Sequence, residues 1–197
     1  MIPDVAVMAA TGLEADAARR ELPDVRVYET GIGLQRHDGS GIAMAISCGL
    51  AGGLRGDLAS GTVLIPATVG LADGTMRACD PQLVAGLTSA ARSLGFEPVA
   101  DPLLTADSIV RGDERARWAS FGFAGVDMET AKLRSAVFAA VRVILDTPKQ
   151  ELSADWERPI AAMVRPWNWP QAVWLARFAP PYARRAAQIV RQALAGR

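Results

Sequence analysis

The N-terminal third of the chain alternates short apolar runs with polar or glycine-rich turns. Residues 5–10 form a continuous apolar run, and residues 13–22 are rich in helix-forming residues. This pattern predicts a buried strand, a turn and a helix. Residues 25–30 and 41–47 predict two more strands, each of which ends in a glycine-rich loop.

The middle of the chain continues this alternation of strands and helices. Leucine, valine and alanine side chains recur on one helical face over residues 81–94. Residues 72–75, Ala-Asp-Gly-Thr, predict a hairpin turn. Further strands are predicted over residues 61–69, 98–104, 121–128 and 141–145. The alternation indicates an α/β three-layer sandwich around a central mixed β-sheet.

The C-terminal segment differs from the rest in charge and composition. Residues 158–197 contain seven arginines and no Asp or Glu, so residues 1–157 carry a net charge of −7 in a chain that is neutral as a whole. We therefore divide one domain into an α/β core, residues 1–157, and a basic, tryptophan-rich helical extension, residues 158–197. Prolines predict that the extension consists of short helices and loops; they are Pro159, Pro166, Pro170, Pro180 and Pro181.

Two interpretations of the basic extension stay open. Over residues 182–193, apolar and arginine side chains occupy different helical faces, as in a helix that packs on a sheet with its arginines in water. Alternatively, the tryptophans and arginines form a surface that contacts anionic lipid, or an interface between subunits.

Composition excludes several classes of protein. Half of the 197 residues are hydrophobic, and 21 basic residues balance 21 acidic ones, which excludes disorder and the strong positive field of a nucleic-acid binder.

Cys48 and Cys79 are expected to be reduced, because a domain of this size does not depend on one disulfide. Residues 1–13 have the pattern of neither a signal peptide nor a membrane span, so a cytoplasmic location is expected.

The ends of the predicted strands carry the candidate chemistry, because ligands of open α/β sheets bind outside the carboxyl ends of strands. Gly31 and Gly33 by themselves are typical of a turn with positive φ. Residues 47–53 contain three glycines within five positions, which lets a backbone approach a ligand closely. Acidic side chains follow two other strands, within residues 127–129 and at Asp146.

Five stretches at strand ends occur in a recognisable order along residues 5–146. They are Gly31-Ile-Gly33, Gly49-Leu-Ala-Gly-Gly53, Gly56-Asp57, Val126-Asp-Met-Glu129 and Val141-Arg-Val-Ile-Leu-Asp146. In this order they resemble the nucleoside phosphorylase and nucleosidase superfamily, which implies a phosphorylase/hydrolase-like fold. Residues 47–54 and 127–130 look closest to the hopanoid-associated branch of that superfamily, which is thought to remove adenine from adenosylhopane.

The resemblance implies roles for four residues. Asp146 matches the general acid that gives a proton to the departing purine, and Glu129 matches the glutamate that binds ribose hydroxyls. Met128 would pack beneath the sugar, and Glu14 matches the glutamate that orients the attacking water. From the residues alone, Asp146 could instead cap a turn, Glu129 could lie at a helix N-terminus, and Glu14 could be a solvated first-turn glutamate.

The other positions expected to bind substrate lie in or beside the matched stretches. They are Asp127, Gly31, Gly33, Ser47, Cys48, Gly49, Ala51, Gly52, Ile109 and Arg142. No metal or organic cofactor is implied, and the single histidine, His37, lies in a polar loop without a ligand set for zinc.

The chain departs from the family pattern at four places, one of which is the segment between Glu129 and Arg142, which looks short by about one helical turn. Residues 34–40 are too few for the usual helix and predict a loop, so a somewhat shortened sheet edge is expected. Ile109 stands where the family usually stacks the purine on an aromatic ring. Leu145 replaces the serine that usually precedes the catalytic aspartate.

These observations favour a purine nucleosidase that hydrolyses a lipid-linked adenine nucleoside such as adenosylhopane. Glu14 favours water over phosphate as the nucleophile. A homo-oligomer is expected, with peripheral contact at the inner membrane face as one interpretation of the basic extension. The alternatives are a nucleosidase or phosphorylase acting on soluble methylthioadenosine or another purine nucleoside, and a catalytically weak homologue that binds a nucleoside.

Overall fold

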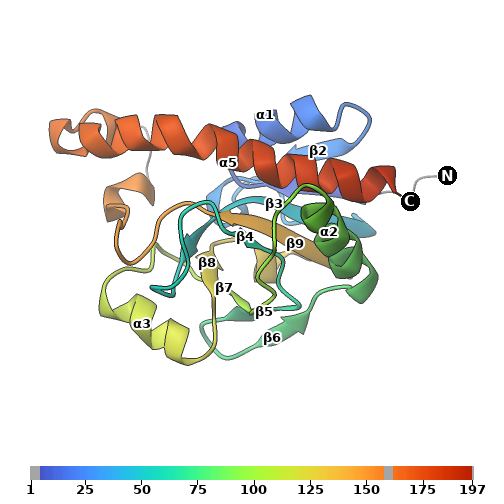
Figure 1. The fold of residues 1–197 in the computed structure, drawn as a ribbon, viewed down its shortest axis with the longest axis horizontal. Coiled ribbons are helices and arrows are strands. Elements are labelled where there is room, and N and C mark those ends of the chain that lie inside the picture. Colours follow the sequence, from blue (N-terminus) through green and yellow to red (C-terminus); the bar gives the residue numbers. More distant parts are fainter. Residues whose placement is uncertain (1–4, 158–161, 197) are drawn as a thin grey trace.

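A computed structural model describes residues 5–157 and 162–196, in which helices flank a nine-stranded mixed sheet (Figure 1). The strands are β1 (Val5–Ala9), β2 (Arg26–Glu29), β3 (Met44–Gly53), β4 (Val63–Leu64), β5 (Thr68–Leu71), β6 (Met76–Ala78), β7 (Leu103–Thr105), β8 (Gly125–Asp127) and β9 (Val137–Ile144). The α-helices are α1 (Gly12–Glu21), α2 (Pro81–Ser93), α3 (Asp113–Ser120) and α5 (Trp169–Ala195). Short 3-10 helices are η1 (Ile32–Leu34), η2 (Thr130–Lys132), η3 (Ala154–Glu157) and η4 (Pro166–Asn168). The predicted α/β fold with a central mixed sheet is confirmed.

Strand β3 is the centre of the sheet. It runs parallel to β1 on one side and to β9 on the other, and its last two residues pair antiparallel with β8. Beyond β1 the sheet continues into β2, and beyond β8 it continues through β7 and β5 to β6. The carboxyl ends of β1, β3 and β9 therefore meet at one edge, where β8 approaches from the opposite direction.

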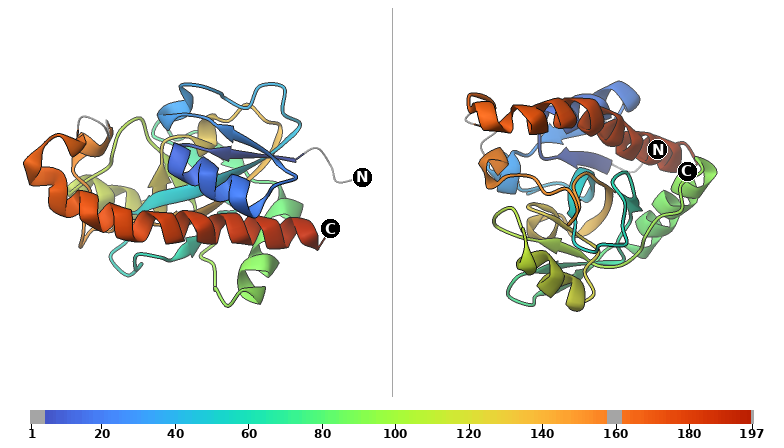
Figure 2. Two further views of the ribbon diagram at one scale, coloured as in Figure 1. Left: turned by 90° about the horizontal axis from the view of Figure 1, so that it is seen from above. Right: turned by 60° about the vertical axis from the view of Figure 1, so that its left-hand side comes forward.

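Helices lie on both sides of the sheet (Figures 1 and 2). On one side, α5 contacts α1, α2, β3 and β9, and its Ile189 and Val190 join the main hydrophobic core. On the other side, α3 packs Trp118 against a smaller apolar cluster that includes Phe123. This arrangement leaves the meeting point of the strand ends between α3 and the N-terminal end of α5.

The glycine-rich stretch that was predicted to be a loop is instead part of a strand. Strand β3 continues through Cys48 to Gly53, and Leu50 and Ala51 are in register with β9. The prediction was wrong because β9 and β8 supply ladder partners as far as Gly53, which outweighs the low strand propensity of glycine.

The prediction of short helices and loops in the C-terminal segment was also wrong. Helix α5 runs for 27 residues and passes through Pro180 and Pro181. A proline inside a helix costs roughly 3 kcal/mol, but α5 buries Ala183, Ile189 and Val190 against the sheet beyond the prolines. Within the described residues, no helix is long and apolar enough to cross a membrane. Residues 158–161, which include the predicted domain boundary, lie outside the described residues.

Arg184 and Arg191, in the second half of α5, lie on its exposed face, as the interpretation of a helix packed on the sheet expected; their side chains are 67% and 56% exposed. Arg184 and Arg191 bind the Glu21 carboxylate of α1, with N···O distances of 2.7 and 2.9 Å. The Arg185 guanidinium lies 4.5 Å from the centre of the Phe96 ring. These arginines therefore hold α5 against the body of the domain.

The remaining predicted elements occur with shifted ends. The predicted turn over residues 72–75 joins β5 to β6, and residues 34–40 contain no α-helix, as expected. The run over residues 61–69 is divided into β4 and β5, with Pro66 between them. Strand β9 begins at Val137, earlier than predicted, because it pairs with β3 along its full length.

Candidate active site

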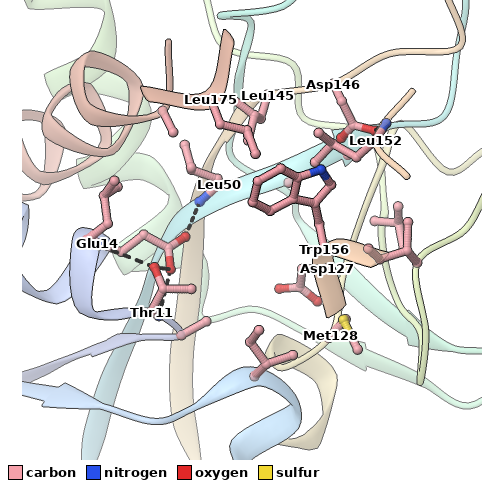
Figure 3. Close-up of a pocket in the computed structure, with 18 of the residues that line it drawn as sticks. Thr11, Glu14, Leu50, Asp127, Met128, Leu145, Asp146, Leu152, Trp156 and Leu175 are labelled. Atoms are coloured by element: carbon pink, nitrogen blue, oxygen red, sulfur yellow. Dashed lines mark hydrogen bonds between the residues drawn. The ribbon is translucent and has the colours of Figure 1, made fainter. Parts of the chain in front are cut away.

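A cavity of about 500 Å³ lies where β1, β3, β8 and β9 converge (Figure 3). The fold gathers acidic side chains from three separate segments of the chain into its wall. Of the residues predicted to form the site, the wall contains Glu14, Ala51, Gly52, Ile109, Asp127, Met128, Glu129 and Asp146.

Glu14 is a buried carboxylate that the protein holds from two sides (Figure 3). Its Oε1 accepts the Leu50 N–H at 2.7 Å, and its Oε2 accepts the N–H and hydroxyl of Thr11 at 2.9 and 2.7 Å. Thr11 also caps α1, so the two residues form a capping box. The protein uses three of the roughly four acceptor positions of a carboxylate. Glu14 is therefore oriented rather than solvated, and it can accept one more hydrogen bond.

Asp146 follows β9 and pairs with a cation that the sequence analysis did not identify. Arg115 of α3, only 1% exposed, donates from Nη2 to Asp146 Oδ2 and from Nη1 to the Gly53 carbonyl at 2.7 Å. Burial raises the pKa of Asp146, and the charge of Arg115 opposes that rise. The other oxygen, Oδ1, lies next to Gly52 in the cavity wall, where it can exchange a proton with a ligand.

Glu129 lies just beyond β8 and is also buried. Its Oε1 accepts the Gly33 N–H at 2.9 Å, and Arg142 Nη2 lies 3.8 Å from its Oε2. Burial and the neighbouring Asp127 charge raise the pKa of Glu129 to about 7, although Arg142 acts in the opposite direction. The carboxyl group therefore changes its charge near neutral pH.

Asp127 differs from Glu129 because protein donors occupy both of its oxygens. Oδ2 accepts Arg142 Nη2 at 2.6 Å, and Oδ1 accepts the Thr105 hydroxyl at 2.7 Å. Arg142 also donates to Ser47 Oγ at 2.7 Å. These side chains form a buried network that fixes the segment carrying Glu129, so the geometry gives Asp127 a positioning role.

Two glycines of β3 make room for the carboxylates. A Cβ at Gly49 would lie 2.2 Å from Glu14 Oε1, and a Cβ at Gly52 would lie 3.1 Å from Asp146 Oδ1. A side chain at Gly49 would displace the Glu14 carboxylate. The glycines thus permit close approach of two acids to a strand, rather than forming the ligand-binding loop that the sequence suggested.

Six residues predicted to contact substrate lie behind the cavity wall. Burial raises the pKa of the Cys48 thiol to about 12, so it is not a nucleophile at neutral pH. Positive φ angles at Gly31, just before η1, and at Gly33, inside η1, shape this turn. In the part of the chain that the structure describes, the six that do not line the cavity are Gly31, Gly33, Ser47, Cys48, Gly49 and Arg142.

The part of the wall contributed by η3, α5 and the chain around them is apolar, and it was not predicted from the sequence. Trp156 projects into the region shown in Figure 3, and its indole N–H donates to Gln171 at 2.8 Å. Helix α5 adds small and branched side chains at helical spacing, which is a pattern that the sequence contained. The apolar wall consists of Leu152, Trp156, Met163, Ala172, Leu175, Ala176 and Ala179.

His37 has a structural environment away from the cavity wall. Its Nδ1 accepts the Gly39 N–H at 2.9 Å, and its ring packs on Tyr28 with centroids 4.7 Å apart. Across residues 5–157 and 162–196, no group of three or more His, Cys, Asp and Glu side chains could hold a metal ion.

The fold is shared with solved nucleosidase structures. A mutant Helicobacter pylori methylthioadenosine/S-adenosylhomocysteine nucleosidase with 5′-methylthioadenosine in its active site has a TM-score of 0.76 and 14% identity, with 100% of both chains covered. Futalosine hydrolase from the same organism has a TM-score of 0.75 and 14% identity, covering 100% of this chain and 99% of that one. The corresponding Neisseria meningitidis nucleosidase, in complex with methylthio-immucillin-A, has a TM-score of 0.73 and 18% identity, covering 98% and 99%. No protein-family model and no curated protein matches the sequence.

Proposed function

We propose that this protein hydrolyses the N-glycosidic bond of an adenine nucleoside and releases adenine. The observation that carries the proposal is the meeting of Glu14, Glu129 and Asp146 in one cavity, each in a different environment. The likeness to a nucleosidase that holds 5′-methylthioadenosine in its active site supports the same class of substrate.

Each acidic side chain has a part in the reaction. Glu14 accepts a hydrogen bond from the attacking water and then takes its proton. The water oxygen forms a bond to C1′ of the ribose, and the bond from C1′ to the purine nitrogen breaks, leaving its electron pair on the purine. Asp146 gives a proton to the purine ring through Oδ1. Glu129 binds the ribose hydroxyls and stabilises positive charge on the sugar, beneath which Met128 packs.

The charge of the cavity favours water over phosphate. Arg115 is the only cationic side chain among the described residues of the wall, and it pairs with Asp146. Behind the wall, the single charge of Arg142 offsets only part of the charge of Asp127 and Glu129. Together with Glu14, these acids leave a negative excess that would repel a phosphate dianion, because like charges in a partly buried site interact strongly. The nucleophile we propose is therefore water.

We further propose a lipid-linked nucleoside, such as adenosylhopane, as the substrate. Such a molecule needs an apolar surface next to the site that binds its ribose, and the wall from η3 and α5 offers one. The alternative substrate is soluble methylthioadenosine, in keeping with the ligand of the Helicobacter pylori structure. A homologue that binds a nucleoside without turnover is the second alternative.

Chromatographic detection of adenine tests the proposal. The purified protein is incubated with adenosylhopane in liposomes and with soluble methylthioadenosine, in buffer with and without phosphate. We expect adenine from the liposomal substrate without phosphate. Release from methylthioadenosine alone would favour the soluble alternative, a requirement for phosphate would contradict hydrolysis, and no release from either would overturn the enzymatic proposal.

A further inference from the structure

The N-terminal end of α5 and the segment before it present a concentrated apolar surface. Among the described residues, nine large hydrophobic side chains are exposed, and five of them lie within residues 163–173. We name this group the mouth patch; it consists of Met163, Val164, Trp167, Trp169 and Val173, which are between 59% and 76% exposed. Exposed apolar clusters of this kind mark interaction sites.

The mouth patch is continuous with the cavity. Met163 belongs to both, and the Trp169 indole N–H donates to the Met163 carbonyl at 3.2 Å. On α5, Ala172 and Ala176 line the cavity, and they lie three residues, about one helical turn, beyond Trp169 and Val173 of the patch. This end of α5 lies at the edge of the molecule, far from the C-terminus (Figure 2). A ligand that leaves the cavity along the apolar wall therefore arrives at the mouth patch.

The charges around the mouth patch leave a small positive excess, because Asp155 offsets Arg165 while Arg177 has no acidic partner among the described residues. Residues 162–196 contain arginines but no Asp or Glu. Exposed Arg165 and Arg177 flank the patch. The nearest acidic side chain, Asp155, pairs with Arg165 and accepts hydrogen bonds from the Trp167 indole and the Asn168 amide. The surface as a whole suits an anionic partner.

We propose that the mouth patch docks on an anionic lipid surface and places the cavity entrance against it; the inference rests on the proposed function. Tryptophans at the headgroup level and arginines attracted to anionic lipid are a combination typical of interfacial segments. A second copy of the chain fits less well. A twofold contact through the same patch would add a second Arg177 but no acid free to pair with it, because Asp155 already pairs with Arg165.

Vesicle binding tests this proposal without altering the reaction site. The full chain is mixed with vesicles of phosphatidylcholine containing phosphatidylglycerol, and with vesicles of phosphatidylcholine alone, and bound protein is measured by co-sedimentation. We expect stronger binding to the anionic vesicles. Brominated lipids are expected to quench tryptophan fluorescence of the unmodified protein, which gives a readout that needs no variant.

A matched pair of variants locates the contact. The triple variant Val164→Ser, Trp167→Ser, Val173→Ser is expected to bind anionic vesicles at least about tenfold more weakly, because it removes three apolar groups. The control variant Met76→Ser, Phe121→Ser changes exposed apolar residues elsewhere and keeps binding. Both variants are expected to release adenine from a soluble nucleoside at the unmodified rate.

The outcomes separate this inference from the proposed function. No vesicle binding by the unmodified protein, or equal binding by the triple variant, would overturn the docking proposal. A dimer in sedimentation velocity that the triple variant dissociates, without vesicle binding, would assign the patch to a second copy instead. Vesicle binding without adenine release from any nucleoside would overturn the proposed function and leave the docking surface standing.

Discussion

The acidic wall and the apolar wall of the cavity are held in place by different forces. Glu14 and Asp146 lie next to strand β3, and hydrogen bonds from Thr11, Leu50 and Arg115 fix their carboxylates. The apolar wall comes from η3, α5 and the chain around them, and it depends mainly on packing. In this wall, the Trp156 indole N–H donates a hydrogen bond to the Gln171 side chain of α5.

The two walls therefore control different properties of the cavity. Side chains fixed by several hydrogen bonds keep the geometry that a reaction needs. Apolar side chains on a helix surface can change with little effect on that geometry. We therefore expect changes in the acidic wall to affect the rate with every nucleoside, and changes in the apolar wall to affect which 5′ group binds.

Substitution of Asp146, the proposed general acid, has the largest expected effect. Asp146→Asn removes the proton donor but keeps a similar shape, and proton transfer of this kind typically contributes roughly 10²–10⁴-fold to the rate. We expect kcat for adenine release to fall by that factor while binding of the nucleoside, measured by calorimetry, is retained. Asp73→Asn, in the exposed turn between β5 and β6, is the matched control and should leave kcat unchanged. A fully active Asp146→Asn variant would contradict the assignment.

Substitution of Glu129, the proposed ribose-binding residue, has the next largest expected effect. Hydrogen bonds to a charged group are worth about 1.5–3 kcal/mol, so Glu129→Gln is expected to lower kcat/KM roughly 10- to 100-fold. In the proposed mechanism the carboxylate form of Glu129 binds ribose, so kcat/KM of the unmodified protein should rise as the pH passes the Glu129 pKa of about 7. The variant should lose that rise; its persistence would assign the titration to another group.

Substitution of Arg115 is expected to change the pH dependence of adenine release. In the proposed mechanism the active form of Asp146 is protonated, so activity should fall as the pH rises through its pKa, which Arg115 lowers. Arg115→Met should move the alkaline limb of kcat/KM to higher pH by about 1–3 units, the usual effect of an adjacent opposite charge. Arg117→Met, on the exposed side of α3, is the control. Lower stability with an unmoved limb would show that Arg115 only attaches α3 to the core.

The role of the apolar wall in binding the 5′ group is tested by placing a large side chain in it. Ala172→Phe places a ring in the wall, whereas Ala195→Phe places the same ring at the far end of α5. We expect the first variant to raise KM for a long-chain 5′-alkylthioadenosine about tenfold, which corresponds to 1.4 kcal/mol of lost contact. KM for methylthioadenosine should hardly change. Equal effects on both substrates would contradict the division between the walls.

The smallest expected effect is on stability. The folded pKa of Glu129 lies above its ordinary value of 4.5, so its protonated form is favoured in the folded state. Its contribution to stability is therefore fully present below pH 4.5 and is lost as the pH rises through about 7. Urea unfolding between pH 4 and 8 should show a loss of stability over this window that Glu129→Gln reduces. No difference between the two proteins would contradict the raised pKa.

Much of the fold and several acids of the cavity could be predicted from the sequence. The apolar patterns of β1, α1 and α2 are local, and the packing of neighbouring elements stabilises the same strand and helices that these patterns predict. The glycine stretch of β3 could not be predicted, because its pairing with β9 and β8 involves distant segments. Helix α5 was missed for a related reason, since the burial that offsets Pro180 and Pro181 is not a local property.

Arg115 and the apolar wall could not be assigned from the sequence for different reasons. Arg115 lies between Arg111 and Arg117 in a charged segment, and nothing local distinguishes the buried arginine from its exposed neighbours. The sequence of α5 does contain the helical spacing of small and branched side chains. The cavity that these side chains line is set by the tertiary fold. The sequence-based roles of Asp146, Glu129 and Glu14 stay predictions that the variants above will test.

The most direct test of the central claim is the rate of adenine release from a series of 5′-alkylthioadenosines in phosphate-free buffer. The nucleosides share one purine and one ribose and differ only in the 5′ chain, from methyl to decyl. We predict release from every member, with kcat/KM rising as the chain lengthens, because the acidic wall acts on the shared part and the apolar wall on the chain. An absence of adenine from the whole series, with a correctly folded protein, would contradict the account.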